Sequence, residues 1–375
     1  MKIWSEINLF AFLCGAVSVL LLTPLFQALA VKTGFLDCPQ ANHKGHRRPT
    51  PLLGGAAMFT GWILCLGAGL AAVHCSNGGW LAEAVGSHLA GIRAVAPQLA
   101  VVVIGAFLSM ALGLIDDKWA MTAGVKFGGQ FLIAALAATW GGVRVSVFLS
   151  HPVPVWCATV FWIMLLMNSI NFFDNMDGLA VGTISIAMAL FTTVAALNHQ
   201  YFIAVFAALT CGVGCGFWFY NYNPATIFMG DSGSHFLGYM TAVISAGVTY
   251  FCRDYSLSRF PILMPLFILA LPLFDTAMVV AIRTANRKPF WIGDHNHISH
   301  RFVRMGLSRK QAVWLVHLLA LTIGLGILPV FWGDFRTAAI LVSQAFLMLL
   351  IVTVLQFALS DRQDTREDQH PNQGV

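Results

Sequence analysis

The sequence predicts an all-α fold, a polytopic membrane helix bundle that crosses the bilayer about eleven times. Of the 375 residues, 58% are hydrophobic and only 10% are charged, which is too little charge for a water-soluble chain of this length. The apolar residues also recur in stretches of about 20 residues, the length of helix that crosses the hydrocarbon core of a bilayer. These observations exclude soluble globular, collagen-like, disordered, disulfide-scaffold and nucleic-acid-binding proteins.

The predicted spans follow from breaking the apolar runs at clusters of charge, proline, glycine and asparagine. They are residues 7–31, 52–73, 98–115, 123–140, 155–170, 179–197, 202–220, 236–251, 261–282, 312–331 and 337–359. These spans leave no room for a second folded domain, so residues 1–359 are predicted to form one transmembrane domain. Residues 360–375 are polar and have no apolar face, and we expect this tail to be disordered.

The 21 Lys and Arg residues are divided unequally between the two predicted sides of the membrane. Fifteen lie on one side and six on the other, and cytoplasmic loops carry the excess of basic residues. This predicts an N-terminus outside the cell and a C-terminus in the cytoplasm. Carboxylates gather near the cytoplasmic span ends, where a charge beside lipid needs a cation, a metal ion or water and by default marks a functional site.

Two adjacent carboxylates, Asp116 and Asp117, end the third predicted span. Because like charges repel, we expect either that one of them is protonated or that a cation lies beside them. Lys126 and Gln130 share a face of the next span by their i, i+4 spacing and would lie at the same entrance. A helix-capping cluster is the simpler alternative for the two carboxylates.

The end of the fifth span carries a run of amide and carboxylate side chains: Asn168, Asn171, Asp174, Asn175 and Asp177. Their spacings of three and four would place them along one edge of a helical segment. A purely structural role poorly explains five polar side chains beside lipid, and we therefore predict that they bind a ligand.

A third polar segment, Gly230-Asp231-Ser-Gly, follows the seventh span. Its glycines allow backbone amides to approach phosphate, and Asp231 offers the hard oxygen ligand that Mg²⁺ prefers. A Gly-Asp turn alone is weak evidence. Together with the two preceding clusters it predicts a site for a phosphate-containing ligand.

Two basic segments complete the set. The loop from His43 to Pro51 contains Lys44 and suits either a positive-inside loop or a polyanionic ligand. In the longest inner connection, spacings of 3, 4 and 7 would place four side chains on one face of a helix: His297, His300, Arg301 and Arg304. The arginines favour contact with phosphate oxygens over a His-based metal site.

Taken in order, these segments resemble the polyprenyl-phosphate N-acetylhexosamine-1-phosphate transferase family, integral membrane enzymes that start lipid-linked glycan assembly. The resemblance covers about residues 30–310. Its motifs are His43-Lys44 to Gly54-Gly55, Asp116-Asp117, Asn168 to Gly178, Gly230-Asp231-Ser-Gly, Pro272-Leu-Phe-Asp275-Thr276 and His297-x-x-His300-Arg301. One departure is Ser299, because relatives similar to the bacterial GlcNAc-1-phosphate transferases usually have a third histidine there.

The resemblance implies that a UDP-N-acetylhexosamine, with UDP-GlcNAc preferred, gives its sugar-1-phosphate to undecaprenyl phosphate and releases UMP. It implies Mg²⁺ as cofactor, with Mn²⁺ left open, and an active site on the cytoplasmic face of a bacterial inner membrane. The implied partners are the UDP-sugar, the polyprenyl phosphate and membrane lipid. No nucleic acid is expected, and a homodimer is left open.

The resemblance also implies a role for each cluster. Asp231 would bind the metal ion, and Asp116 or Asp117, with Asp116 preferred, would receive the proton of the lipid phosphate or orient it. The substrate-binding residues would be Lys44, Lys126, Asn171, Asp174, Asn175 and Asp177. The groups that engage the pyrophosphate would be His297, His300 and Arg301. A direct attack by the lipid phosphate and a covalent phosphosugar intermediate on an Asp are both left open.

Two alternatives remain. A phospho-MurNAc-pentapeptide transferase would usually carry a Pro-x-His-His-His-Phe-like segment, where this chain has His295-Asn-His297-Ile-Ser-His300-Arg301. A secondary transporter would also hold carboxylates in the membrane. Transporter sites, however, lie near the bilayer midplane and often between repeated halves, and this sequence shows no internal repeat.

The predicted sidedness can be tested by cysteine labelling in intact cells. A cysteine placed in the loop from His43 to Pro51, with the native cysteines replaced, should be protected from an impermeant reagent added outside. A cysteine placed beside Arg253 should react. Labelling of the His43 loop from outside would invert the predicted topology.

Overall fold

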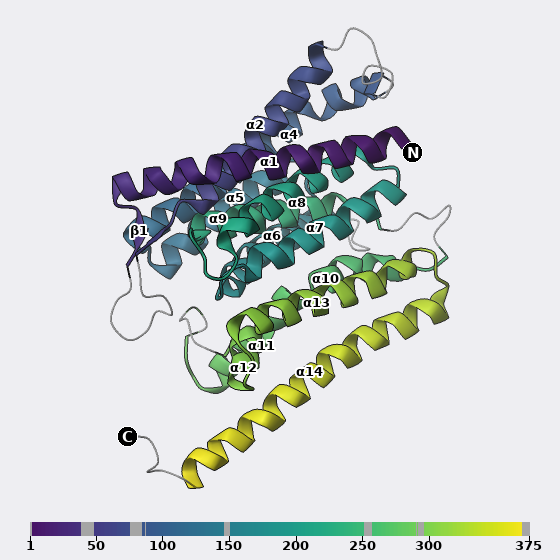
Figure 1. The fold of residues 1–375 in the computed structure, drawn as a ribbon. Helices are drawn as coiled ribbons and strands as arrows, with labels where there is room; N and C mark the ends of the chain where they lie inside the picture. Colours follow the sequence, from purple (N-terminus) through teal and green to yellow (C-terminus); the bar gives the residue numbers. More distant parts are fainter. Residues whose placement is uncertain are drawn as a thin grey trace. The chain divides into compact units, whose positions relative to one another are not determined.

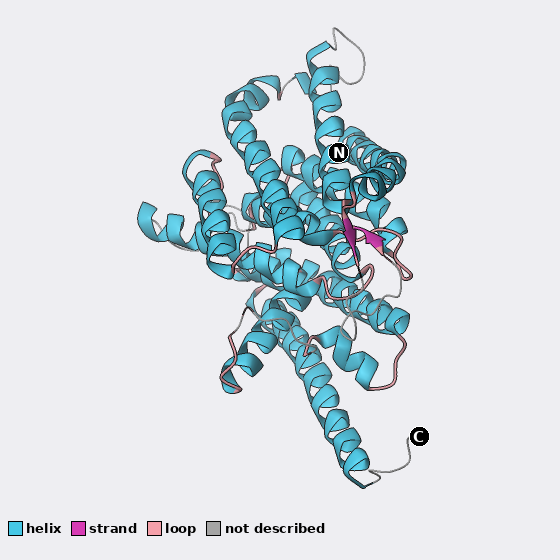
Figure 2. Cartoon of the chain, turned by 90° about the vertical axis from the view of Figure 1, so that its left-hand side faces the viewer, coloured by secondary structure: helices cyan, strands magenta, loops and turns pink. Residues whose placement is uncertain are grey.

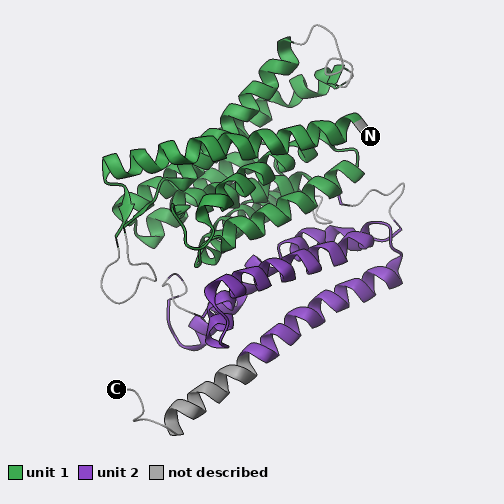
Figure 3. Cartoon of the chain, in the orientation of Figure 1, with its two compact units in different colours: residues 1–249 green, residues 250–375 purple. Residues whose placement is uncertain are grey.

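The computed structural model of the 375-residue chain describes residues 2–38, 49–75, 85–86, 88–145, 151–250, 257–289, 291 and 296–369. The chain forms two compact units, Met1–Thr249 and Tyr250–Val375, which are coloured separately in Figure 3. Among the described residues, helices make up both units apart from one pair of two-residue strands (Figure 2). The all-α prediction is confirmed.

The first unit is a helix bundle built around α9. Its elements are α1 (Lys2–Thr33), β1 (Leu36–Asp37), β2 (Thr50–Pro51), α2 (Gly54–Cys75), α4 (Leu89–Trp119), α5 (Ala123–Trp140), α6 (Pro152–Phe173), α7 (Leu179–Leu197), α8 (Tyr201–Asn221) and α9 (Gly230–Gly247) (Figure 1). The strands pair antiparallel. Helices α2, α4, α6, α7 and α8 all contact α9, and most residues of α9 are buried. The start of α9 is therefore held by several helices at once.

Two glycines allow the first turn of α9 to approach its neighbours closely. A Cβ added to Gly113 of α4 would overlap the carbonyl group of Asp231, and one added to Gly55 of α2 would overlap the backbone nitrogen of Gly233. Both positions lie far inside van der Waals contact, so a larger residue would displace backbone. The backbones of α2 and α4 thus touch residues 231–233 directly.

The second unit is made of a broken helix, a short helix and two long helices. Its elements are η1 (Phe260–Leu263), α10 (Met264–Ile268), α11 (Ala270–Ala285), α12 (Ile298–Arg304), α13 (Arg309–Ile327), η2 (Leu328–Phe331) and α14 (Phe335–Gln369). The chain bends by 72° between Ile268 and Ala270. Pro272 contributes to this break, because it has no N–H to donate to the carbonyl of Ile268.

The prediction of eleven spans is confirmed in part. In the described part of the chain eight helices are long and apolar enough to cross a membrane, or nine if the bent pair over Phe260–Ala285 is one span. The other two predicted spans are present as helices α5 and α9, but polar side chains occupy their first turns. Lys126 and Asp231 are among these side chains, so residues of the candidate site themselves lower the apolar character of the two helices. The predicted sidedness stays a prediction.

Helix α14 is assigned as far as Gln369, and residues 370–375 lie outside the described residues. The disordered tail over residues 360–375 stays a prediction. The single domain over residues 1–359 stays a prediction.

The close approach at Gly113 predicts the effect of a single methyl group. Gly113→Ala should destabilise the protein by about 1–3 kcal/mol, because the new Cβ must push against the Asp231 backbone. Gly128→Ala is the matched control, since no heavy atom lies within 4 Å of its added Cβ in α5. Thermal unfolding in detergent should show a lower Tm for the first variant only. Equal Tm values would contradict the close contact.

Candidate active site

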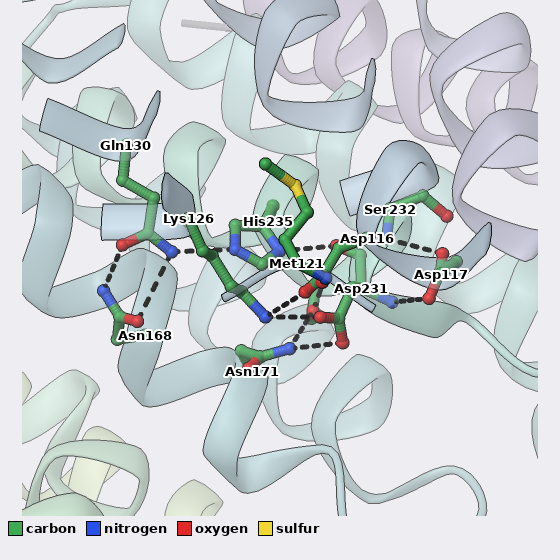
Figure 4. A network of polar contacts seen from close by, with 11 residues as sticks. Asp116, Asp117, Met121, Lys126, Gln130, Asn168, Asn171, Asp231, Ser232 and His235 are labelled. Carbon is green, nitrogen blue, oxygen red and sulfur yellow. Dashed lines mark hydrogen bonds and ion pairs between the residues drawn. The ribbon is translucent and has the colours of Figure 1, made fainter. Parts of the chain in front are cut away.

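The carboxylate of Asp231 is the centre of a polar network at the start of α9 (Figure 4). One of its oxygens, Oδ2, pairs with the Lys126 ammonium group, and Oδ1 accepts a hydrogen bond of 2.8 Å from the Asn171 amide. Lys126 Nζ also lies 2.7 Å from Asp116 Oδ2. The ammonium group of Lys126 is therefore held between two carboxylates that come from different helices.

The two adjacent carboxylates of α4 have different partners. Asp116 Oδ1 accepts from the Met121 backbone N–H at 2.6 Å, and its other oxygen faces Lys126. Asp117 accepts from the backbone N–H groups of Asp231 at 2.7 Å and Ser232 at 3.1 Å. Asp117 thus caps α9, where a negative charge also complements the positive end of the helix dipole. The repulsion expected between the two carboxylates is offset by Lys126 and by these N–H groups.

The ion-pair group is partly open to solvent. The exposed fraction of the side chain is 11% for Asp116, 17% for Lys126 and 30% for Asp231. These groups are paired with one another, yet Asp231 keeps an accessible edge. A ligand that carries phosphate or a cation can therefore reach Asp231 without unfolding the surrounding helices.

The predicted helical edge from Asn168 to Asp177 is only partly helical. Helix α6 ends at Phe173, and Asp174 to Gly178 form the turn to α7, where Gly178 has a φ of 75°. Asn171 stays on α6, and its amide bonds both Asp231 and Ser234 Oγ. The chain turns here because Gly178 accepts a left-handed conformation that other residues avoid. The predicted single edge is therefore divided between a helix and a turn.

Asp174 and Asn175 lie in this turn with different surroundings. Burial, together with the nearby negative charges of Asp231, Asp177 and Asp117, raises the pKa of Asp174 to about 8. This direction favours the protonated form of the Asp174 carboxyl. Asn175 donates to the Phe172 carbonyl at 3.1 Å.

Asp177 ties the turn to the segment that leads into α9. Its Oδ2 accepts from the Asn223 amide at 2.9 Å and from the Ala225 N–H at 3.1 Å. Asn221 makes a second tie, because its side chain accepts from the Gly178 N–H and donates to the Ile227 carbonyl, both at 3.0 Å. The predicted role of Asp177 in holding a substrate stays a prediction.

A second predicted group lies in the second unit, around the start of α12. His297 Nδ1 lies 2.7 Å from Asp275 Oδ2, and Asp275 Oδ1 accepts from the Ile298 N–H at 2.6 Å. Asp275 and His297 are both buried. The carboxylate fixes the orientation of the imidazole and leaves Nε2 as the nitrogen that can meet another group.

The helical face predicted for this group is corrected by the structure. His297 precedes α12 as its N-cap residue in an extended conformation, so it does not share a helical face with the others. Arg301 is buried and its Nε donates to the Asn296 carbonyl at 3.0 Å, whereas Arg304 is exposed. The His297 and His300 ring centroids lie 6.4 Å apart. The Asp275 carboxylate, which spacing alone could not pair with His297, explains the departure from helical geometry.

The structure thus brings together five of the predicted residues: Asp116, Asp117, Lys126, Asn171 and Asp231. Lys44 lies outside the described residues. Sequence reasoning gave no role to Gln356, whose amide donates to the Ile298 carbonyl at 3.2 Å. A glutamine within the apolar final span was the available signal.

The donor set fits a magnesium ion that is shared with a substrate. In the described part of the chain no group of three or more His, Cys, Asp or Glu side chains could hold a metal ion by itself. The carboxylates of Asp116 and Asp231 do bracket a cationic group, the Lys126 ammonium. Mg²⁺ commonly binds through one or two carboxylates together with water and substrate phosphates, which suits this pair.

Comparisons with known proteins place this site in a family. Residues 99–249, which include the whole Asp231 network, match the family described as Glycosyl transferase family 4. The chain is 30% identical to a probable undecaprenyl-phosphate N-acetylglucosaminyl 1-phosphate transferase of Bacillus subtilis, over 91% of this chain and 88% of that protein. The chain belongs to the polyprenyl-phosphate N-acetylhexosamine-1-phosphate transferase family. It is a phosphoglycosyltransferase and a multi-pass membrane protein.

Other relatives of the family bear two different names. A decaprenyl-phosphate N-acetylglucosaminephosphotransferase of Mycolicibacterium smegmatis is 28% identical over 92% of this chain and 87% of its own length. A phospho-N-acetylmuramoyl-pentapeptide-transferase of Mycobacterium bovis is 29% identical over 86% of this chain and 96% of its own length. The two identities are nearly equal, so identity alone does not select the sugar.

The contacts of Asp117 predict that it supports the fold of α9. Asp117→Asn keeps one oxygen that can accept from the Asp231 N–H but turns its NH₂ toward the Ser232 N–H, so it should cost less than the roughly 1–2 kcal/mol of a fully lost cap. Asp117→Ala should lower the Tm measurably, because both N–H groups lose their acceptor. An Asp117→Asn variant with wild-type Tm and no turnover would instead identify Asp117 as a group that acts in the reaction.

Proposed function

We propose that this enzyme transfers GlcNAc-1-phosphate from UDP-GlcNAc to undecaprenyl phosphate at the cytoplasmic membrane face and releases UMP. The observation that supports this most directly is the Lys126 ammonium held between Asp116 and Asp231 at a partly exposed edge. Phosphoryl transfer depends mainly on positioning and on neutralising charge, and this group supplies both. The cytoplasmic face is supported by the excess of basic residues on that predicted side.

In the proposed reaction an oxygen of the lipid phosphate attacks the β-phosphorus of the UDP-sugar. The bond from that phosphorus to the bridging oxygen breaks, UMP leaves with the oxygen, and the sugar phosphate becomes part of a lipid-linked pyrophosphate. Asp116 is proposed to orient the lipid phosphate or to receive its proton, and Lys126 to attract the phosphate oxygens. Asp174, Asn175 and Asp177 are proposed to hold the nucleotide, with Asp177 also anchoring the segment that leads into α9.

Magnesium is the proposed cofactor, since the family is generally Mg²⁺-dependent. Asp231 would hold the ion, with Asp116 beside it, and the ion would neutralise charge on the transferred phosphoryl group. His297, His300 and Arg301 are proposed to engage the donor pyrophosphate. Their chemistry supports this, because an arginine fork can bind two phosphate oxygens and Asp275 orients the His297 ring.

One assay distinguishes UDP-GlcNAc from UDP-MurNAc-pentapeptide as the sugar donor. The purified enzyme should be given undecaprenyl phosphate, Mg²⁺ and a panel of UDP-sugars, with UMP release as the readout. UDP-GlcNAc is expected to support turnover, in line with the names of the Bacillus and Mycolicibacterium relatives. Turnover with UDP-MurNAc-pentapeptide alone would replace the proposed donor with the one that the name of the Mycobacterium bovis relative indicates.

Asp231→Asn tests the proposed metal ligand. The substitution keeps the shape of the side chain but removes the charge that Mg²⁺ requires, so turnover should fall by at least about 100-fold while the protein still folds. Chelation of Mg²⁺ should have the same effect on the wild-type enzyme. The control is Asp334→Asn, which changes an exposed carboxylate at the start of α14. Near-normal Mg²⁺-dependent turnover of Asp231→Asn would remove the assignment.

A further inference from the structure

The helices that hold Asp231 carry a second set of polar side chains one helical turn away. The first set, the carboxylate layer, consists of Lys126 on α5, Asn171 on α6 and Asp231 on α9. The second set, the amide-imidazole layer, consists of Gln130, Asn168 and His235 on the same three helices. Each member lies three or four residues from its counterpart, so the two layers share the same helix faces (Figure 4).

The side chains of the amide-imidazole layer are linked by a continuous row of hydrogen bonds. Gln130 and Asn168 bond each other through both amides, at 2.7 Å and 3.3 Å. The second N–H of Asn168 donates to the Met164 carbonyl at 2.8 Å, and that of Gln130 faces His235 Nε2 at 2.8 Å. His235 Nδ1 lies 2.6 Å from the carbonyl oxygen of Asp231. The row of hydrogen bonds therefore runs from the backbone of α6, at Met164, to the backbone of Asp231, the proposed metal ligand.

The two acceptors at the ends of this row fix the direction of every hydrogen bond in it. Met164 and Asp231 present carbonyl oxygens, which only accept. Asn168 must therefore turn its NH₂ toward Met164, and Gln130 must turn its oxygen toward Asn168 and its NH₂ toward His235. His235 then accepts at Nε2 and donates from Nδ1 to Asp231, which makes it a neutral imidazole. Every side-chain N–H in the layer has an acceptor.

Burial gives this layer a different task from the carboxylate layer. Gln130 and His235 are completely buried, whereas Lys126 and Asp231 are partly exposed. A buried polar group is costly unless it is hydrogen-bonded, so a shift of α5 along α9 would leave Gln130 and His235 unpaired. Lysine has a long flexible stem and could follow Asp231 through such a shift. The short amide and imidazole contacts cannot, so they set the relative position of the helices.

We propose that Gln130, Asn168 and His235 are positioning residues for the transfer reaction. They hold α5, α6 and α9 so that Lys126 and Asn171 both meet the carboxylate of Asp231. This inference rests on the proposed role of Asp231. Its consequence is that the layer controls turnover and the response to Mg²⁺ more than binding of the UDP-sugar, because the nucleotide is proposed to be held by Asp174, Asn175 and Asp177, outside the layer.

The test replaces the whole layer with apolar side chains of similar size. The triple variant Gln130→Met, Asn168→Leu, His235→Leu leaves no polar side chain of the layer unpaired, so it should fold with a Tm near that of the wild type. Its kcat should fall roughly 10- to 100-fold, because small displacements of reacting groups reduce rate by such factors. The Mg²⁺ concentration for half-maximal activity should rise, while KM for the UDP-sugar should stay within about threefold of wild type.

A conservative variant and a control complete the design. His235→Gln can accept from Gln130 and donate to the Asp231 carbonyl, and should recover much of the turnover that His235→Leu loses. Ser245→Ala removes a contact between α9 and Trp162 of α6, about four helical turns from Asp231. It should change Tm without changing the Mg²⁺ response.

The outcomes separate this inference from the proposed function. If the wild type is active and the triple variant keeps its kcat and its Mg²⁺ response, the positioning role is overturned and Asp231 stays as proposed. The same holds if His235→Gln is no better than His235→Leu. Absence of wild-type turnover with any UDP-sugar would contradict the proposed function, and the positioning role would fall with it.

Discussion

The ion pair between Lys126 and the carboxylate of Asp231 is the interaction on which the first unit depends. Charged groups at the ends of membrane helices are costly to bury unless each finds an opposite charge or a hydrogen-bond partner. Asp231 meets this requirement through Lys126 of α5 and Asn171 of α6, and the Asp117 carboxylate of α4 accepts from its backbone N–H. Four helices therefore end or begin at one carboxylate, which is why motifs far apart in the sequence belong to one site.

Close packing and polar contacts have different roles at the start of α9. Gly55 of α2 and Gly113 of α4 allow backbones to touch at the start of α9, where the Asp117 carboxylate of α4 accepts from the Asp231 and Ser232 N–H groups. The amide-imidazole layer then limits sliding of the helices in a buried region, while the carboxylate layer stays partly exposed to meet substrate. Rigidity is thus placed one turn away from the groups that need access. This is how a helix bundle can keep charged groups in place and still leave them reactive.

Reasoning from the sequence identified the helices and the polar clusters because both depend on local composition. Asp116 and Asp231 could be placed near the ends of spans because each carboxylate interrupts or borders an apolar run in the sequence. Pairings between helices were beyond that reasoning, so the cap made by Asp117 and the bond from Asp275 to His297 emerged only from the fold. Two of the eleven predicted spans, α5 and α9, are less apolar than the others because they carry polar residues of the candidate site in their first turns.

A double-mutant cycle on Lys126 and Asp231 tests this account most directly. The free energy of unfolding in mixed detergent micelles should be measured for Lys126→Met, Asp231→Asn and the double variant. Removing Lys126 alone leaves two carboxylates without a cation, so Lys126→Met should cost more in the wild-type protein than in the Asp231→Asn variant. A coupling free energy of about 1 kcal/mol or more is predicted for groups in direct contact. Additivity within about 0.5 kcal/mol would contradict the central place given to this ion pair.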